Sequence, residues 1–144
     1  MNAYADTSFL VSLYTPDANS PRAIASLRAL REPLPFTPFH RLEFRNAIRL
    51  RVFRGELSGP ERSAALQALD DDLQDGVLVH TAIPWTDTLR ESERLGAAHT
   101  ERLGVRSADI LHVAAALRLQ AKELLSFDVH QRKLAAAEGL KVRP

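Results

Sequence analysis

Short apolar segments recur along the chain, each bounded by prolines, glycines or acidic residues. Their length and their boundaries are typical of short β-strands rather than of helices. We predict five strands, at Ala3–Ala5, Leu34–Thr37, Val77–Thr81, Glu123–Phe127 and Leu140–Val142.

Longer stretches with apolar residues at helical spacing lie between these segments. Pro21 suits the first turn of a helix, and the alanine-rich segment 107–119 is apolar nearly all round, which predicts a buried helix. Gly104 or a neighbour is expected to cap the helix before it. We predict helices over residues 9–14, 20–31, 39–53, 60–73, 84–99, 107–119 and 131–138. Strands that alternate with helices predict an α/β fold with a parallel sheet.

Four acidic residues stand where a predicted strand ends or a predicted helix begins. Asp6 and Asp128 follow strands, whereas Glu43 and Asp109 lie early in helices that follow strands. Because these positions share one edge of a parallel sheet, we expect the four carboxylates to converge there. Each also has a structural alternative: a helix cap for Asp6, a turn for Asp128, and stabilisation by the helix dipole for the other two.

Convergence of four carboxylates would require a neutralising partner. Two carboxylates about 4 Å apart repel by roughly 4 kcal/mol at an effective dielectric constant near 20. Protonation, arginines or a cation could relieve this repulsion. Oxygen ligands without cysteines or a histidine pair suit Mg²⁺ or Mn²⁺, and such an ion can activate a water molecule while it holds a phosphate oxygen.

Small polar residues flank three of the acids. Ser8 lies two positions after Asp6, Asn46 lies one helical turn after Glu43, and Ser126 shares a strand face with Asp128. These side chains could orient a carboxylate or contact a phosphate, although serine is also a common helix cap. His112, one turn after Asp109, is predicted to be a core residue with one hydrogen bond.

Composition limits the class of protein. The 144 residues are 45% hydrophobic and 26% charged, with a net charge of +1 and no cysteine. One domain over residues 1–144 is therefore expected, without disulfides or a cysteine nucleophile and in keeping with a reducing cytoplasm. Neither a membrane span nor a signal peptide is expected. If the chain binds RNA, the first arginines to test are Arg51, Arg54, Arg106 and Arg132.

Four segments together resemble the PIN-domain nucleases, and in particular the VapC-type toxins of bacterial toxin–antitoxin pairs. These segments are YADTSFLVSL, LEFRNAIR, SADILHVAAAL and LLSFDVHQRKLAAAEGLKV, and they occur in the family's order. The resemblance implies a three-layer α/β/α fold around a central five-stranded parallel sheet.

The resemblance also implies a function. It implies Mg²⁺- or Mn²⁺-dependent hydrolysis of RNA phosphodiester bonds. The implied metal ligands and catalytic acids are Asp6, Glu43, Asp109 and Asp128, and the implied supporting residues are Ser8, Asn46 and Ser126. Members of this group generally dimerise, and a VapB-like antitoxin silences them, which implies a homodimer and a toxin–antitoxin hetero-oligomer.

Two other functions fit parts of the pattern. The acidic pocket could belong to a non-catalytic binding module in which it docks arginines of a partner protein. A phosphatase or phosphotransfer domain on a similar sheet is the other alternative. Such domains usually carry paired acids after the first strand, whereas Asp6 is followed by Thr7 and Ser8.

Overall fold

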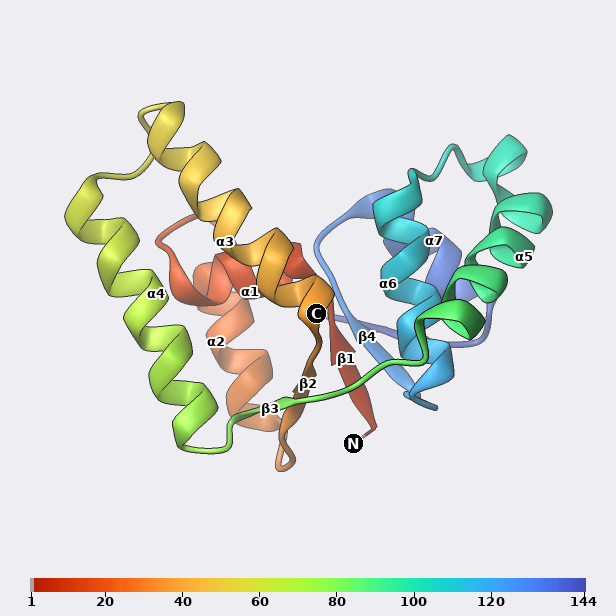
Figure 1. The fold of residues 1–144 in the computed structure, drawn as a ribbon, viewed down its shortest axis with the longest axis horizontal. Helices are drawn as coiled ribbons and strands as arrows, with labels where there is room; N and C mark the ends of the chain where they lie inside the picture. Colours follow the sequence, from red (N-terminus) through yellow and green to blue (C-terminus); the bar gives the residue numbers. More distant parts are fainter. Residues whose placement is uncertain (1) are drawn as a thin grey trace. The chain divides into compact units, whose positions relative to one another are not determined.

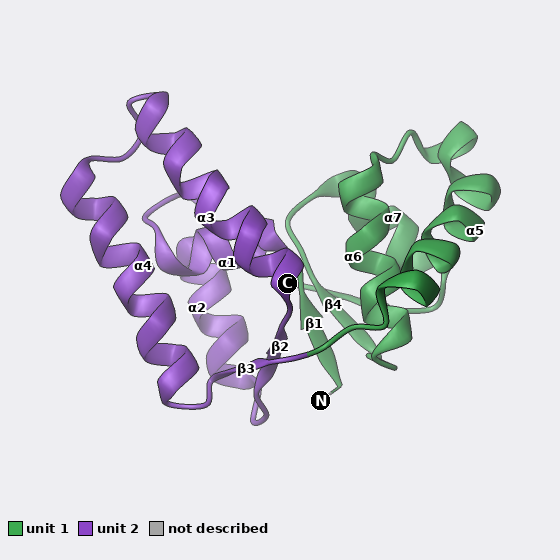
Figure 2. Ribbon diagram, viewed as in Figure 1, with its two compact units in different colours: residues 1–6, 82–144 green, residues 7–81 purple. Residues whose placement is uncertain are grey.

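The computed structural model describes residues 2–144 of the chain, which form seven helices and five strands (Figure 1). Contacts divide these residues into two compact units, coloured separately in Figure 2. Unit 1 comprises residues 1–6 and 82–144, and unit 2 comprises residues 7–81. None of the described helices is both long and apolar enough to cross a membrane.

All strand pairs are parallel, which confirms the α/β class. In unit 1, β1 (Ala3–Ala5), β4 (Glu123–Leu125) and β5 (Lys141–Arg143) form a three-stranded sheet in the order β1-β4-β5. In unit 2, β2 (Leu34–Phe36) pairs with β3 (Leu78–His80). The prediction of one central five-stranded sheet is therefore wrong: the main sheet has three strands. The three-layer arrangement stays a prediction.

Pro35 affects the edge of β2 that faces away from β3. The Leu34 N–H donates to the Val77 carbonyl, and the Thr81 N–H donates to the Phe36 carbonyl. Residues alternate in direction along a strand, so the backbone of Pro35 faces away from β3. Because proline has no N–H, this edge of β2 lacks a donor that a further strand would need.

Unit 1 places three helices around its sheet. They are α5 (Trp85–Leu103), α6 (Ser107–Arg118) and α7 (Val129–Ala137), and α5 contacts α6 along its length (Figure 1). The buried core joins Leu95 and Val113 of these helices to Tyr4 and Leu124 of the strands. Gly104 ends α5 with a left-handed φ of 65°, a conformation that glycine adopts without strain, as the sequence predicted.

Unit 2 holds the remaining helices, α1 (Thr7–Tyr14), α2 (Ser20–Ala29), α3 (Pro38–Phe53) and α4 (Gly59–Gln74). Capping boxes start two of them: Thr37 caps α3 together with His40, and Ser58 caps α4 together with Glu61. In both, the cap side chain accepts the N3 backbone N–H, and the N3 side chain accepts the N-cap N–H. These local bonds define the helix starts.

Asp17 fixes the turn between α1 and α2. Its carboxylate accepts hydrogen bonds from Ser12 Oγ at 2.8 Å, from the Asn19 N–H at 2.8 Å and from Arg51 Nη2 at 3.2 Å. Burial raises the pKa of this carboxyl group, but the three donors and the positive charge of Arg51 outweigh burial and hold the pKa below its ordinary value.

Candidate active site

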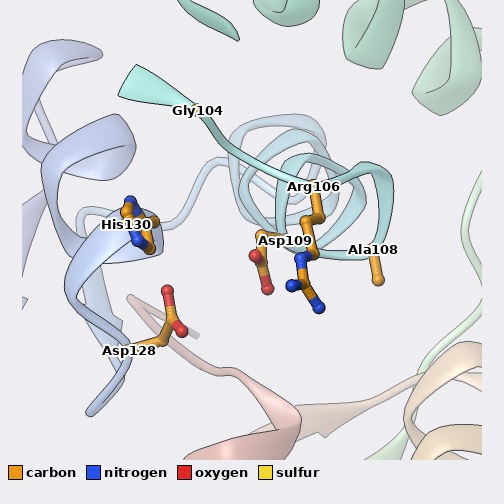
Figure 3. Close-up of a pocket in the computed structure, with 6 residues that line it drawn as sticks. All are labelled: Gly104, Arg106, Ala108, Asp109, Asp128 and His130. Carbon is orange, nitrogen blue, oxygen red and sulfur yellow. The ribbon is translucent and has the colours of Figure 1, made fainter.

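Unit 1 contains a pocket of about 530 Å³, within the range typical of ligand pockets. Two of the predicted acids, Asp109 and Asp128, direct their carboxylates into it (Figure 3). The remaining lining residues are Gly104, Arg106, Ala108 and His130. Asp109 lies in the first turn of α6, and Asp128 immediately precedes α7. The structure thus brings together two acids that are far apart in the sequence.

Asp128 has a structural role as well as a place in the pocket. It is the N-cap of α7, where its Oδ1 accepts the backbone N–H of Gln131 at 2.8 Å. Helix α7 consequently begins at Val129, two residues before the predicted start. The cap explains why the carboxylate has a fixed position, because it is bonded to the helix that it starts.

Ser126 joins Asp6 to Asp128. Asp6 is 2% exposed and Ser126 is fully buried, and Ser126 Oγ–H donates to Asp6 Oδ2 at 2.5 Å. The same Oγ accepts the Asp128 N–H at 3.1 Å. Arg132 donates to the carbonyl of Ser126 at 2.7 Å, which further fixes this backbone. One hydroxyl group therefore bonds both to the carboxylate of Asp6, which follows β1, and to the backbone N–H of Asp128, which follows β4.

Gln131 belongs to this network, although the sequence analysis did not select it. The side chain is 1% exposed, and its Nε2 donates to the Asp109 carbonyl at 3.2 Å. Its Oε1 lies 3.1 Å from Ser126 Oγ. The sequence does contain a pattern that points to Gln131: it follows Asp128 by three residues, which is the spacing of a capping box. Here the glutamine side chain connects the elements that carry Asp109 and Ser126.

Unit 2 carries the other three predicted residues. Glu43, half-buried on α3, accepts a hydrogen bond from Thr7 Oγ1 at 2.7 Å. Ser8 and Asn46 are exposed on α1 and α3. Thr7 is the residue after Asp6 in the chain, so the partner of Glu43 is covalently next to the first acid. Convergence of all four carboxylates stays a prediction.

A buried pair connects the strand that precedes Asp6 to the helix that carries Asp109. Tyr4 on β1 and His112 on α6 are 0% and 3% exposed, and the Tyr4 hydroxyl lies 2.8 Å from His112 Nδ1. The prediction that His112 is a hydrogen-bonded core residue is confirmed. The pair therefore connects β1 to α6 within the core of unit 1.

The donor set fits a hydrated hard cation. Among residues 2–144, no three histidine, aspartate or glutamate side chains form a group arranged to hold a metal ion. Mg²⁺ keeps several of its waters and commonly binds through one or two carboxylates and substrate phosphates. The carboxylates of Asp109 and Asp128 in one pocket meet that requirement, whereas zinc sites usually add several histidine or cysteine ligands.

Several solved structures are similar to the chain, among them the three that follow. VapC20 of Mycobacterium tuberculosis, a toxin that cleaves the sarcin–ricin loop, is 20% identical with a TM-score of 0.68, over 99% of both chains. VapBC2 of Rickettsia felis, bound to a promoter DNA fragment, is 14% identical with a TM-score of 0.66, over 99% of this chain and 98% of that one. FitAcB of Neisseria gonorrhoeae is 16% identical with a TM-score of 0.63, over 99% and 96%.

No protein with a curated description matches the chain. At the identities given above, the likeness to the solved structures concerns the fold. The family model described as "PIN domain" matches residues 3–137, which is nearly the whole sequence. The chain therefore belongs to the PIN domain family.

Proposed function

We propose that this protein is a metal-dependent endoribonuclease that hydrolyses RNA phosphodiester bonds with Mg²⁺ or Mn²⁺. The observation that carries the proposal is the pocket of unit 1, in which Asp109 and Asp128 face the same space in a chain of the PIN family. Oxygen ligands of this kind suit a hard divalent cation. A bound ion would supply a water molecule of lowered pKa and an electrophile for a phosphate oxygen.

The residues of the chain would hold and orient this chemistry. Asp109 and Asp128 would bind the ion, and the cap bond from the Gln131 N–H fixes one oxygen of Asp128. Ser126 holds Asp6 in a fully buried contact. Such supporting hydrogen bonds fix the orientation of ligating carboxylates, and their loss commonly lowers metal affinity or activity about 10- to 100-fold.

Glu43 is proposed as the fourth acid, with Ser8 and Asn46 as residues that orient it or contact the substrate. The support is the bond between Glu43 and Thr7, which directly follows Asp6 in the sequence. We propose one catalytic domain over residues 1–144 on this basis, built as the three-layer fold of the family.

The protein is further proposed to be a VapC-type toxin with a VapB-like antitoxin as its partner. The similar structures include complexes of toxin with antitoxin, and helix α3 exposes Leu42, Leu50 and Phe53. Phe53 is 87% exposed, which is unusual for so large an apolar side chain. Such positions suit contacts with an antitoxin or with a second copy of the chain. Cytoplasmic RNA is the proposed substrate.

Asp128→Asn tests the function because asparagine can replace aspartate as a helix cap. Asparagine and aspartate are about equally good N-caps, so the free energy of unfolding of the variant should lie within about 0.5 kcal/mol of the parent's. It loses a charged metal ligand, and we expect RNA cleavage with Mg²⁺ or Mn²⁺ to fall by about 100-fold or more. Asp75→Asn, at an exposed position after α4, is the matched control and should cleave RNA like the parent.

Purified protein, freed of any copurified partner, would be incubated with RNA in Mg²⁺, in Mn²⁺ and in EDTA. Cleavage should require one of the ions. Cleavage by Asp128→Asn at the parent's rate would contradict the proposal, as would cleavage that persists in EDTA. If neither ion supports cleavage by the parent, a non-catalytic binding module becomes the better account.

A further inference from the structure

Arg106 is the only permanently charged cation among the residues that line the pocket. It precedes α6, and its side chain lines the pocket together with Asp109 (Figure 3). The side chain is exposed, and within residues 2–144 it forms no ion pair with a carboxylate. The exposed guanidinium can therefore donate N–H bonds to a ligand in the pocket.

Two of the other arginines that the sequence suggested as RNA contacts already have partners. Arg132 donates to the carbonyl of Ser126, and Arg51 in unit 2 is bonded to Thr15 and Asp17. His130 also lines the pocket, but its Nδ1 lies 3.2 Å from the carbonyl of Leu103. That carbonyl can only accept, so Nδ1 is used as a donor to the backbone.

We propose that Arg106 binds a phosphate of the RNA strand that enters this pocket, next to the phosphodiester bond that is cleaved. The proposal rests on the proposed ribonuclease function. A planar guanidinium forms paired N–H···O bonds to two phosphate oxygens, a geometry that a lysine ammonium cannot reproduce. A fixed positive charge beside two carboxylates also offsets their repulsion of the phosphate backbone.

The test is a salt titration of RNA binding. A fluorescently labelled single-stranded RNA would be titrated in EDTA, where cleavage is stopped, at several salt concentrations, with the parent, Arg106→Ala, Arg106→Lys and Arg90→Ala. Arg90 is an exposed arginine of α5 outside the pocket and serves as the matched control. Thermal unfolding of each variant would establish that it is folded.

The salt dependence reports the number of phosphates that the protein neutralises. Loss of one phosphate contact on a single strand should reduce the slope of log K against log salt by about 0.7. For Arg106→Ala we expect this change together with roughly tenfold weaker binding at low salt. Arg106→Lys should keep the parent's slope, since it keeps the charge, and bind with intermediate affinity. Arg90→Ala should match the parent in the salt slope and in the affinity.

Cleavage kinetics then separate this inference from the proposed function. With Mg²⁺, Arg106→Ala should show a KM raised about tenfold and a kcat changed less, because the lost contact is made in the ground state as well as in the transition state. A parent that cleaves RNA, with an Arg106→Ala variant of unchanged slope and affinity, would overturn the role of Arg106 alone. An Arg90→Ala variant impaired to the same extent would also overturn it. A parent that neither binds nor cleaves RNA would overturn both proposals.

Discussion

Replacement of Ser126 by alanine removes a hydroxyl that connects Asp6 with the backbone before α7. Ser126 is fully buried and Asp6 is 2% exposed, so water cannot readily take the place of Oγ. The variant loses the 2.5 Å bond to Asp6 Oδ2 and the 3.1 Å bond from the Asp128 N–H. We therefore expect Ser126→Ala to destabilise the fold far more than an ordinary serine deletion does.

The magnitude follows from the two bonds. A hydrogen bond to a charged group contributes about 1.5–3 kcal/mol and a neutral one about 1 kcal/mol, so the free energy of unfolding should fall by about 3 kcal/mol. With a urea m-value of about 2 kcal/mol/M, the unfolding midpoint should shift down by about 1.5 M. The assay is equilibrium urea unfolding followed by far-UV circular dichroism, for the parent and each variant.

Ser92→Ala is the matched control. Ser92 Oγ donates only to the Thr88 carbonyl of its own helix, at 2.8 Å, a bond that contributes little to helix stability. The free energy of unfolding of Ser92→Ala should change by less than about 0.5 kcal/mol, so its urea midpoint should lie within about 0.3 M of the parent's. If Ser126→Ala shifts the midpoint no more than Ser92→Ala does, the buried network does not have the energetic role argued here.

Two further outcomes follow from buried or shielded hydrogen bonds. Tyr4→Phe removes the bond to His112 and should lower the free energy of unfolding by about 1–2 kcal/mol, seen as a melting temperature lower by about 3–6 °C; an unchanged melting temperature would contradict this. The lowered pKa of Asp17 means that its bonds from Ser12, Asn19 and Arg51 add stability above its ordinary pKa, and that this stability is lost as pH falls through the lowered pKa. Unfolding free energies of the parent and Asp17→Asn, measured from pH 6 to pH 2, should therefore converge at the acid end, and a constant difference would refute the assignment.

The fold class could be predicted because local patterns determine most of its elements. Alternating strand-like and helix-like segments gave the parallel α/β class, and Gly104 marked the end of α5. The division of the strands into a three-stranded sheet and a separate pair could not be predicted from periodicity. It depends on which strands from distant parts of the chain meet, and local patterns do not specify this; Pro35 offers no N–H on the edge of β2 that faces away from β3.

Half of the predicted acids could be placed in one pocket, and the reason is topological. Asp109 and Asp128 lie at a helix start and a strand end of unit 1, and the parallel arrangement puts such positions at one edge. Ser126, which the sequence pairs with Asp128, donates to Asp6 and accepts the Asp128 N–H. Gln131 was missed because its function depends on tertiary contacts to Asp109 and Ser126, which no local pattern specifies.

Asp128 shows why a structural and a functional interpretation of one residue need not compete. The sequence offered a turn residue or a metal ligand as alternatives, and the structure gives a helix cap that also faces the pocket. A carboxylate has two oxygens, so Oδ1 can accept the Gln131 N–H while Oδ2 stays available to a ligand. The cap bond engages only one of the two oxygens and limits the rotation of the side chain. If Asp128 binds a metal ion as proposed, the cap bond would hold its carboxylate in position before the ion binds.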